Sequence, residues 1–410
     1  MGVKLAFWRR EEREEKTLGA DDVLRALLEQ ASSKSGVPVN WRTAQQASTA
    51  MACARLIAEG LSQIPLKLFR DLPGGGREPA SDANVYELLY RQPNAMQTAF
   101  EFLEQRALHL AFCGNAFALI VRVNGRIVEL LPYEPQHVTI KRDGWHVSYE
   151  VDAPDGRKLP VSAVDMWHTR GPSWTFGDGL EGVRLAREAI GLSLALEDHG
   201  SRLFKNGAQP GGLLSTDATP TAEQRQALRE SWEAAYGGAN KFKTAVLWGG
   251  WRWMALASPN DSAQFLESRA FQVEEVCRAF RVLPIMVGHS DKAATFASAE
   301  QMFLAHQVHT MGPWYRRLEQ SADLALLTPK ERAQGLHFRF VVNAMMRGAV
   351  KDRADYYSKL YGIGALNPNE IRALEEMNPY DGGEQYRVPL NMTDPAAEPE
   401  SPQGDANAAP

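Results

Sequence analysis

Apolar residues recur at helical spacing over much of the chain. In the segment TAQQASTAMACARLIAEGLSQIP, Met51, Ala54, Ile57 and Leu61 are three or four positions apart, and Pro65 follows. This spacing places apolar side chains on one face of a helix, which the proline then stops. Further elements before residue 115 are predicted by similar patterns: a strand at 65–71 and helices at 85–92 and 98–113.

An alternating pattern replaces the helical one between residues 116 and 170. Apolar and polar residues alternate there in short segments, which are separated by Asn124-Gly125, Asp143-Gly144 and Asp155-Gly156. Asn-Gly and Asp-Gly pairs between alternating segments favour antiparallel hairpins. The predicted strands are 116–123, 126–133, 137–142, 145–151 and 164–170.

Long helices are predicted in the second half of the chain. One begins with Asp178 and Glu181 and ends at Asn206-Gly207, a length of roughly 40 Å at 1.5 Å per residue. Its apolar residues lie nearly all round the helix, so it needs neighbours on several sides. A second long helix is predicted at 261–280 and a third at 299–327, bent where Gly312-Pro313 interrupts it.

The remaining segments predict smaller elements. A compact insertion between the first two long helices contains a strand at 211–217, a helix at 221–238 and strands at 243–250 and 251–257. A strand at 336–342 and helices at 349–364 and 367–377 complete the ordered part. We expect a mobile arm at 1–40, which includes a short helix, and a disordered acidic and proline-rich tail at 393–410.

Composition restricts the class of protein. Of the 410 residues, 44% are apolar and 23% are charged, as in a soluble globular protein, and the net charge of −5 excludes a uniformly basic nucleic-acid binder. Cys53, Cys113 and Cys277 are far apart in sequence, which argues against a disulfide framework or a thiolate metal site and favours buried thiols. No apolar run approaches 18 residues, so no membrane span is expected.

One polar loop contains the residue types of a hydrolase. His289, Ser290 and Asp291 are consecutive and precede Lys292. Adjacent loop residues point in different directions, whereas a catalytic triad needs a nucleophile bonded to a base and the base to an acid. No G-x-S-x-G motif is present. A plain polar loop is therefore favoured over an active site.

Other candidate sites also favour structural interpretations. His306 and His309 are three residues apart on a predicted helix, but no HExxH motif accompanies them, so we interpret them as surface or packed histidines. Glu274 and Glu275 diverge by about 100° on a helix, which disfavours a carboxylate dyad. The glycine-rich segment GDGLEG has no GK[ST] ending and carries acids that repel phosphate. Three tryptophans could stack on single-stranded nucleic acid, but packing or subunit contacts are favoured: Trp248, Trp251 and Trp253.

Eight blocks between residues 41 and 392 together resemble a known family. They are ACARLIAEGLSQIPLKLFR, LLYRQPNAMQTAFEFLE, CGNAFALIVRVNGRIVELLPYEPQHV, FKNGAQPGGLL, NDSAQFLESRAFQVEEVCRAFRVLPIMVG, AEQMF, MGPWYRRLEQ and LNPNEIRALEEMNPYDGGEQYRVPLN. In this order they resemble the portal proteins of tailed bacteriophages of the HK97 type, a family that includes gene-transfer-agent portals.

The resemblance implies an α+β portal fold that forms a ring. A β-containing wing would comprise 41–177 and 284–345, the latter with a tunnel loop at about 288–298 and the long kinked helix. Two long antiparallel stem helices, 178–208 and 259–283, would bracket a small α/β clip at 209–258. A short helical crown would follow at 346–392.

The resemblance also implies a function without catalysis. A homo-dodecamer at one capsid vertex would form the channel through which double-stranded DNA is packaged and ejected, without sequence specificity, cofactor or metal. Implied partners are the major capsid protein, the large terminase subunit as the ATP-driven motor and head–tail adaptor or connector proteins. The protein would be located in the virion after assembly in the bacterial host cytoplasm, with no membrane partner.

Candidate residues follow from these expected regions. The DNA-facing tunnel loop would present His289, Ser290, Asp291, Lys292 and Thr295. Clip contacts to the motor or adaptor would come from Lys241, Lys243 and Arg252. Candidate intersubunit stem contacts are Arg184, Arg187, Glu188, Glu267, Arg269 and Glu274.

Two alternatives stay open. The chain could be another head–tail connector ring protein without the stem and clip arrangement. It could also be a hydrolytic enzyme centred on His289, Ser290 and Asp291. The size of the assembled particle distinguishes a ring from an ordinary enzyme.

Overall fold

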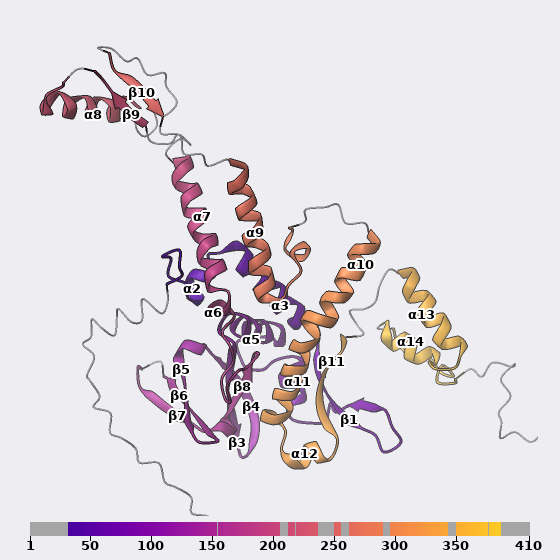
Figure 1. Cartoon of the computed structure of the whole chain (residues 1–410). Helices are drawn as coiled ribbons and strands as arrows, with labels where there is room; N and C mark the ends of the chain where they lie inside the picture. Colours follow the sequence, from indigo (N-terminus) through magenta and orange to yellow (C-terminus); the bar gives the residue numbers. More distant parts are fainter. Residues whose placement is uncertain are drawn as a thin grey trace, which may run out of the picture. The chain divides into compact units, whose positions relative to one another are not determined.

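The protein is a mixed helix and sheet structure (Figure 1), described here from a computed structural model. The described residues are 32–153, 155–205, 212–217, 219–236, 250–255, 262–289, 296–342, 350–375 and 377–386. The chain divides into two units, 1–339 and 340–410. Each unit is described by itself below.

Two helices in contact, α3 (Ser48–Ser62) and α5 (Ala99–Cys113), form the helical core of the first unit. The apolar stripe predicted for the first helix is buried, including Ala54, Ile57 and Leu61. Helix α5 begins with a capping box between Thr98 and Glu101. The Glu101 N–H donates to the Thr98 hydroxyl, and the Glu101 carboxylate accepts from both the N–H and the hydroxyl of Thr98. The predicted helix pattern was therefore correct for both elements. Short helices α2 (Trp41–Ala44) and α4 (Tyr86–Tyr90) lie nearby in sequence.

Two three-stranded antiparallel sheets follow α5. Strands β3 (Asn115–Val123), β4 (Arg126–Tyr133) and β8 (Met166–Arg170) form one sheet in the order β4-β3-β8. Strands β5 (Val138–Asp143), β6 (His146–Asp152) and β7 (Lys158–Val161) form the other. The two sheets share an apolar cluster of Phe117, Tyr149, Val151 and Met166. The hairpin turns predicted the order of these strands, but the sequence analysis missed β7, whose Pro160 and exposed residues obscure its strand pattern.

A third sheet has the order β11-β1-β2, from β1 (Leu66–Asp71), β2 (Arg77–Pro79) and β11 (Leu336–Phe340). Strand β11 shows the alternation that its sequence predicted, because Leu336, Phe338 and Phe340 are buried while the residues between them are half-buried. The sheet joins residues more than 250 positions apart in sequence.

A buried arginine connects α5 to β8 and to α11 (Gly312–Leu326). Arg106 is fully buried and its guanidinium lies 3.9 Å from the ring centroid of Trp167, a cation–π contact. It donates to the Thr169 hydroxyl at 2.7 Å, and the Trp167 indole donates to Ser321 at 3.0 Å. Burial lowers the pKa of Arg106 to about 9. The aromatic face and the hydroxyl thus take the place of a carboxylate partner for this guanidinium.

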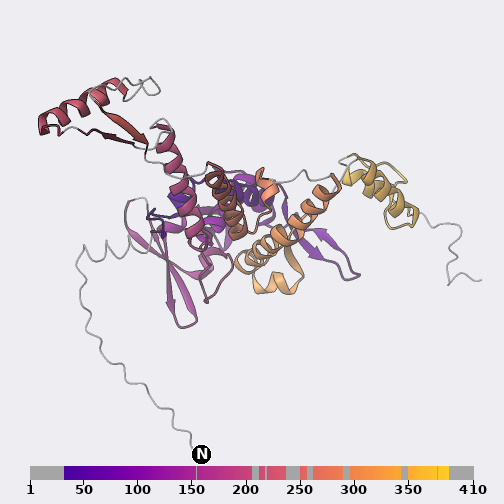
Figure 2. The ribbon, with the colours of Figure 1, turned by 45° about the horizontal axis from the view of Figure 1, so that its top comes forward.

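The first predicted long helix is divided into two pieces. Helix α6 (Gly182–Leu185) and helix α7 (Arg187–Lys205) are separated at Ala186, whose φ of −90° and ψ of 6° depart from helical values. The expected start at 178 is therefore wrong, because 178–181 form a loop that packs against the end of α5. Helix α7 packs beside α9 (Ser262–Phe280), as Figures 1 and 2 both show. Gly200 on α7 permits this approach, because a Cβ there would lie 3.2 Å from the Phe265 ring.

The bend predicted at Gly312-Pro313 takes the form of a π-helical segment. Helix α10 (Phe296–Ala305) continues through a π-helix at His306–Met311 into α11. Pro313 lacks an N–H and its ring crowds the preceding turn, so an α-helical bond pattern cannot persist there. The wider π turn accommodates the proline while the helix continues.

Smaller elements complete the two units. Strands β9 (Gly212–Ser215) and β10 (Arg252–Ala255) pair antiparallel, and helix α8 (Ala222–Tyr236) lies between them in sequence. The predicted strand 243–250 lies outside the described residues. The second unit contains α13 (Val350–Gly362), followed by a capping box at Asn367 and Glu370 that begins α14 (Pro368–Leu374). A 3-10 helix at Pro284–Val287 and the short α-helix α12 (Pro329–Ala333) lie between these elements in sequence.

Residues 32–40 differ from the mobile arm expected at 1–40. Ser33 and Val39 are buried, and the backbone of Ser33 bonds to Val37 at 2.9 Å. The Lys34 N–H donates to Glu188 on α7 at 3.0 Å, and Gly191 leaves space for Ser33. This part of the expected arm packs on α7, so the boundary of the arm was wrong by these residues.

Arg281 adopts a backbone conformation that favours glycine. It follows α9 with a φ of 58°, and the Val282 N–H donates to the Cys277 carbonyl at 2.9 Å, as in a helix-terminating Schellman motif. The residue with left-handed φ in this motif is usually glycine, because a Cβ raises the energy there.

Replacing Arg281 with glycine is expected to raise the free energy of unfolding by about 1 kcal/mol, since the Cβ strain at positive φ is removed. The measurement is the midpoint of urea unfolding. Arg278→Gly, one turn earlier inside α9, is the matched control and should lower stability by about 1 kcal/mol. An unfolding midpoint for Arg281→Gly below that of the original chain would contradict the strain argument.

Candidate functional site

The predicted tunnel loop, 288–298, lies after α9 and overlaps the start of α10 at Phe296, and only its two ends are described. A short 3-10 helix, Pro284–Val287, is followed by Gly288 with a φ of 79°, and the His289 N–H donates to the Pro284 carbonyl at 3.0 Å. Ser290, Asp291, Lys292 and Thr295 lie outside the described residues. The described part therefore fixes where the loop leaves α9, and the proposed contacts of these five residues stay predictions.

The six candidate stem residues divide into three pairs. Glu188 and Glu274 interact within the chain, Glu188 with the Lys34 N–H and Glu274 with Arg278 at 4.0 Å. Glu267 and Arg269 are exposed on α9 and form no ion pair within the described part of the chain. Glu267 and Arg269 are therefore the better candidates for contact with another molecule.

The remaining two, Arg184 and Arg187, lie at the start of α6 and α7. Arg184 is exposed, and the Arg187 Nε is buried without a hydrogen-bond partner among the described residues. Both line the cavity described below. A buried guanidinium nitrogen without a partner is energetically costly, which makes Arg187 a candidate for contact with another molecule.

Of the three candidate clip residues, only Arg252 is described. It lies on β10, is exposed and approaches Asp217 at 3.9 Å. Lys241 and Lys243 lie outside the described residues. A solvent-exposed pair at this distance contributes little, so Arg252 stays available to other partners.

No metal centre is found in the described ranges of the chain, where no three metal-ligating side chains cluster. His306 is buried, consistent with a packed histidine, and burial lowers its pKa. His309 follows within the same π-helix.

None of the described helices is long and apolar enough to cross a membrane.

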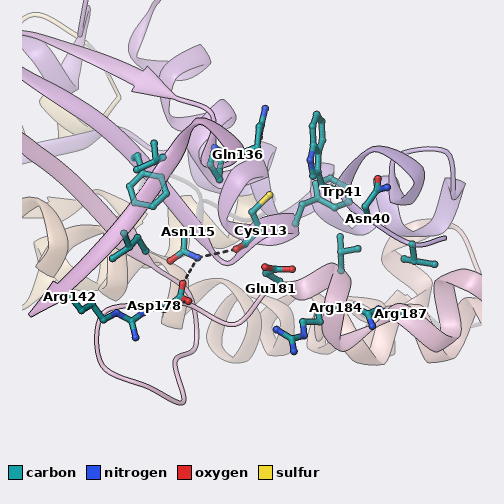
Figure 3. A pocket seen from close by; sticks show the side chains of 17 residues that line it. Asn40, Trp41, Cys113, Asn115, Gln136, Arg142, Asp178, Glu181, Arg184 and Arg187 are labelled. Carbon is teal, nitrogen blue, oxygen red and sulfur yellow. Dashed lines mark hydrogen bonds and ion pairs between the residues drawn. The ribbon is translucent and has the colours of Figure 1, made fainter. Parts of the chain in front are cut away.

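A cavity of about 560 Å³ lies where the two sheets meet α5, α6 and the segment before α3 (Figure 3). Its labelled side chains include Trp41, Gln136, Arg142 and Glu181, which come from four different parts of the chain. Arg142 pairs with Asp178 at 3.5 Å. The cavity is lined by both charges, so it has no strong preference for an anion or a cation. We interpret it as part of a joint between elements.

Asn115 is the central residue of this joint. Its side-chain amide donates to Asp178 at 2.9 Å and to the Cys113 carbonyl at 3.2 Å, and its Oδ1 accepts from the Gly179 N–H at 2.9 Å. One side chain at the start of β3 thus holds the end of α5 and the loop that leads to α6 (Figure 3). No motif in the sequence singled out Asn115 for this role.

Glycines allow the backbone of this loop to contact α5 directly. A Cβ on Gly179 would clash with the Gly114 carbonyl, and a Cβ on Gly182 would clash with the Ala111 carbonyl. Gly114 has a φ of 68° and ends α5 in the left-handed region. The segment GDGLEG, whose phosphate-binding interpretation the sequence disfavoured, therefore serves close backbone packing.

His168 on β8 completes the network as a neutral ring. Its Nε2 lies 2.9 Å from Asn115 Oδ1 and its Nδ1 lies 3.1 Å from the Tyr149 hydroxyl. Burial, and next the charge of Arg170, lower the pKa of His168 to about 3. A neutral ring that donates from Nε2 and accepts at Nδ1 satisfies both contacts.

Large apolar side chains remain exposed on α6 and on the two long helices α7 and α9. Leu185 is 61% exposed and Leu266 is 65% exposed, and Leu192 and Phe271 are also exposed. Val183, Ala186 and Ile190 are buried within the chain. The segment formed by α6 and α7 is thus apolar on several faces, as the sequence predicted, but contacts within one chain cover only some of these faces. Exposed apolar side chains of this size are available for contact with another protein.

Solved structures with the same fold define the class of protein. A chain in the virion of a native gene transfer agent particle matches with a TM-score of 0.57 and 21% identity, over 87% of this chain and 99% of that chain. An HK97 family phage portal protein from Corynebacterium diphtheriae matches with a TM-score of 0.57 and 15% identity, over 75% and 96% of the two chains. The fold is that of a portal protein.

Sequence relatives identify the family. The profile of phage portal proteins matches residues 48–376. The probable portal protein of Streptomyces phage phiC31 is 33% identical over 389 residues, which cover 90% of this chain and 83% of that protein. The portal protein of Enterobacteria phage HK97 is 30% identical over 343 residues, covering 83% and 80%. The chain belongs to the phage portal protein family and is of the HK97 type, as its sequence blocks predicted.

Stability is expected to fall as pH decreases from about 6.5, the pKa of an unfolded histidine, toward the folded value of about 3 for His168. The unfolded chain then binds a proton that the folded chain excludes, at about 1.4 kcal/mol per pH unit for each such histidine. His109, whose pKa burial lowers to about 4, adds to the effect.

The measurement is the urea midpoint at pH 7, 6 and 5. His168→Gln should reduce the dependence on pH by up to about 1.4 kcal/mol per pH unit, because an amide does not titrate. His146→Gln, at an exposed position on β6, is the control and should leave the dependence unchanged. An equal dependence on pH in the original chain and in His168→Gln would contradict this assignment.

Proposed function

We propose that twelve copies of this chain form a ring at one capsid vertex and that double-stranded DNA enters and leaves through its channel. The observation that carries this proposal is the uncovered apolar side chains on α6, α7 and α9, in a chain that belongs to the portal family. In a ring, each pair of long helices has a neighbouring pair on either side. A solved neck of a gene transfer agent particle, described with C12 symmetry, contains a chain that matches this one with a TM-score of 0.55.

The proposed regions follow the family arrangement. The helices and sheets of 41–177 and 284–345 would form the wing, and 178–208 with 259–283 the stem. The clip would be 209–258 and the crown 346–392. The pairing of α7 with α9, and the small β9-β10 sheet that lies between them in sequence, support this division.

In this proposal the loop at 288–298 faces the channel. It begins where Arg281 and Gly288 turn the chain sharply after α9. The proposed DNA-facing residues are all polar and include a single lysine: His289, Ser290, Asp291, Lys292 and Thr295. One lysine per copy gives weak phosphate contacts, and the net charge of −5 also disfavours tight binding that would stall sliding DNA.

Partners are proposed by region. The wing would contact the major capsid protein. The clip, with Lys241, Lys243 and Arg252, would contact the large terminase subunit during packaging and head–tail adaptor or connector proteins afterwards. The protein would assemble in the bacterial host cytoplasm and remain at the portal vertex of the particle. No catalytic role, cofactor or metal is proposed, and DNA would be bound without sequence specificity.

A ring of twelve copies of 45.5 kDa is expected to have a mass of about 546 kDa and to show a central hole in negative stain. Leu185→Asp should shift the protein to small species, because it places a charge in the proposed apolar contact. The measurement is light scattering after size exclusion.

Val123→Asp is the matched control, since Val123 is exposed to a similar degree at the tip of the β3–β4 hairpin. Glu267→Arg should weaken assembly by a smaller amount, about 1 kcal/mol per contact or less. A homogeneous 45.5 kDa species without a hole would rule out the ring. A ring that lacks paired long helices would favour the alternative head–tail connector.

Lys292→Ala is expected to leave ring assembly intact and to change the amount of DNA retained in particles. The physical reason is the loss of one phosphate contact per copy at the channel wall. The measurement is DNA content of particles packaged with the variant, compared with Lys330→Ala on the exposed start of α12 as control. If Lys292→Ala abolishes assembly, the loop is structural rather than a channel element.

The hydrolase alternative has a simple test. Ser290→Ala should leave packaging unchanged in the proposed portal, because a hydroxyl in a sliding contact performs no chemistry. Loss of a measurable hydrolytic activity in Ser290→Ala would instead support the enzyme.

A further inference from the structure

Two of the three cysteines are in contact inside the first unit. Cys53 on α3 and Cys277 on α9 are 224 positions apart, and their Sγ atoms lie 3.7 Å from each other. Both side chains are fully buried, and all three cysteines of the chain are free thiols. Their spacing in sequence gave no sign of this contact, because it arises from the packing of α3 against α9.

We propose that Cys53 and Cys277 are a modification site, in which a small peroxide converts the two thiols into a disulfide that links α3 to α9. The bond is about 2.05 Å long, so the sulfur atoms must approach by about 1.7 Å. A movement of this size is within the range of side-chain rotation. The contact between the two thiols lowers the pKa of Cys277 and raises that of Cys53, so we assign Cys277 as the attacking thiolate.

A largely apolar cavity, which the two cysteines themselves do not line, begins about one helical turn from each of them. It has a volume of about 160 Å³ and is lined by Ile57 and Phe280. Ile57 is four residues after Cys53, and Phe280 is three residues after Cys277, so each lies on the same helix face as its cysteine. A water molecule occupies about 30 Å³, so the cavity can hold a peroxide of similar size.

The chemistry balances with hydrogen peroxide as the oxidant. The Cys277 thiolate attacks one peroxide oxygen, the O–O bond breaks, and the departing hydroxide takes the proton released from Cys277 to become water. The Cys277 sulfenic acid that forms is then attacked by the Cys53 sulfur. The S–S bond forms, the S–O bond breaks, and the hydroxide leaves as a second water with the Cys53 proton. Two thiols are oxidised and one peroxide is reduced to two waters.

The consequence is a covalent link between a core helix and one of the two long helices. The proposed disulfide rests on the proposed function only for where oxidation takes place, since a particle assembled in a reducing cytoplasm later meets an oxidising exterior. A link across 224 positions strongly restricts the unfolded chain, so the oxidised protein should melt at a higher temperature.

The test uses the full chain, treated with hydrogen peroxide, quenched, denatured and alkylated with iodoacetamide. Intact mass should show three alkylated thiols before oxidation and about one afterwards, with a peptide that joins residues 53 and 277. Cys113→Ser is the matched control and should still form the link. Cys53→Ser and Cys277→Ser should not form it, and neither should gain thermal stability on oxidation.

Three alkylated thiols after treatment would overturn the proposal. So would sulfinic acid at either cysteine without a disulfide, a link that uses Cys113, or a lower melting temperature in the linked chain. The result is read from single chains after denaturation, so it does not depend on whether the protein forms a ring.

Discussion

A long helix with apolar residues on several faces needs other protein surfaces around it. In this chain, α7 is partly covered by α9 and by residues 32–40, yet Leu192 on α7 stays exposed, as do Leu185 on α6 and Leu266 and Phe271 on α9. Burying each such side chain stabilises a complex by about 1.5–3 kcal/mol. Repeated around a closed ring, that gain is available to every copy, which makes assembly the natural way to complete the packing.

The joint beneath these helices is built from backbone contacts and one polar network. Asn115 connects α5, β3 and the loop before α6, while His168 and Tyr149 continue the hydrogen bonds into the second sheet. On the other side of the sheet, Arg106 and Trp167 fix β8 to α5 and α11. Each group is buried and has few alternative partners, so the network favours one relative arrangement of the elements that it joins.

Local patterns predicted the elements better than their boundaries. The hairpin pairs Asn124-Gly125 and Asp143-Gly144 gave correct strand order, and the spacing of Ala54, Ile57 and Leu61 gave the buried face of α3. The sequence placed the start of the long helix too early, because Asp178 and Glu181 resemble first-turn residues although Gly179 and Gly182 pack against backbone. Contacts such as Asn115 with Gly179 or Cys53 with Cys277 depend on three-dimensional packing and leave no periodic signal. The family blocks supplied the portal assignment, which no catalytic motif could have given.

The glycine contact between Gly179 and Gly114 has a mechanical consequence for the helix above it. Helix α7 has 19 residues, so it is about 28 Å long, and a 10° change of direction at its base would displace its far end by about 5 Å. At the base of the helix, the glycines let the two backbone segments touch directly, and even a methyl group there would push them apart. The resulting displacement would grow along the length of α7. The absence of side chains at Gly114 and Gly179 therefore helps to set the direction of this helix, and with it the width of any opening that such helices surround.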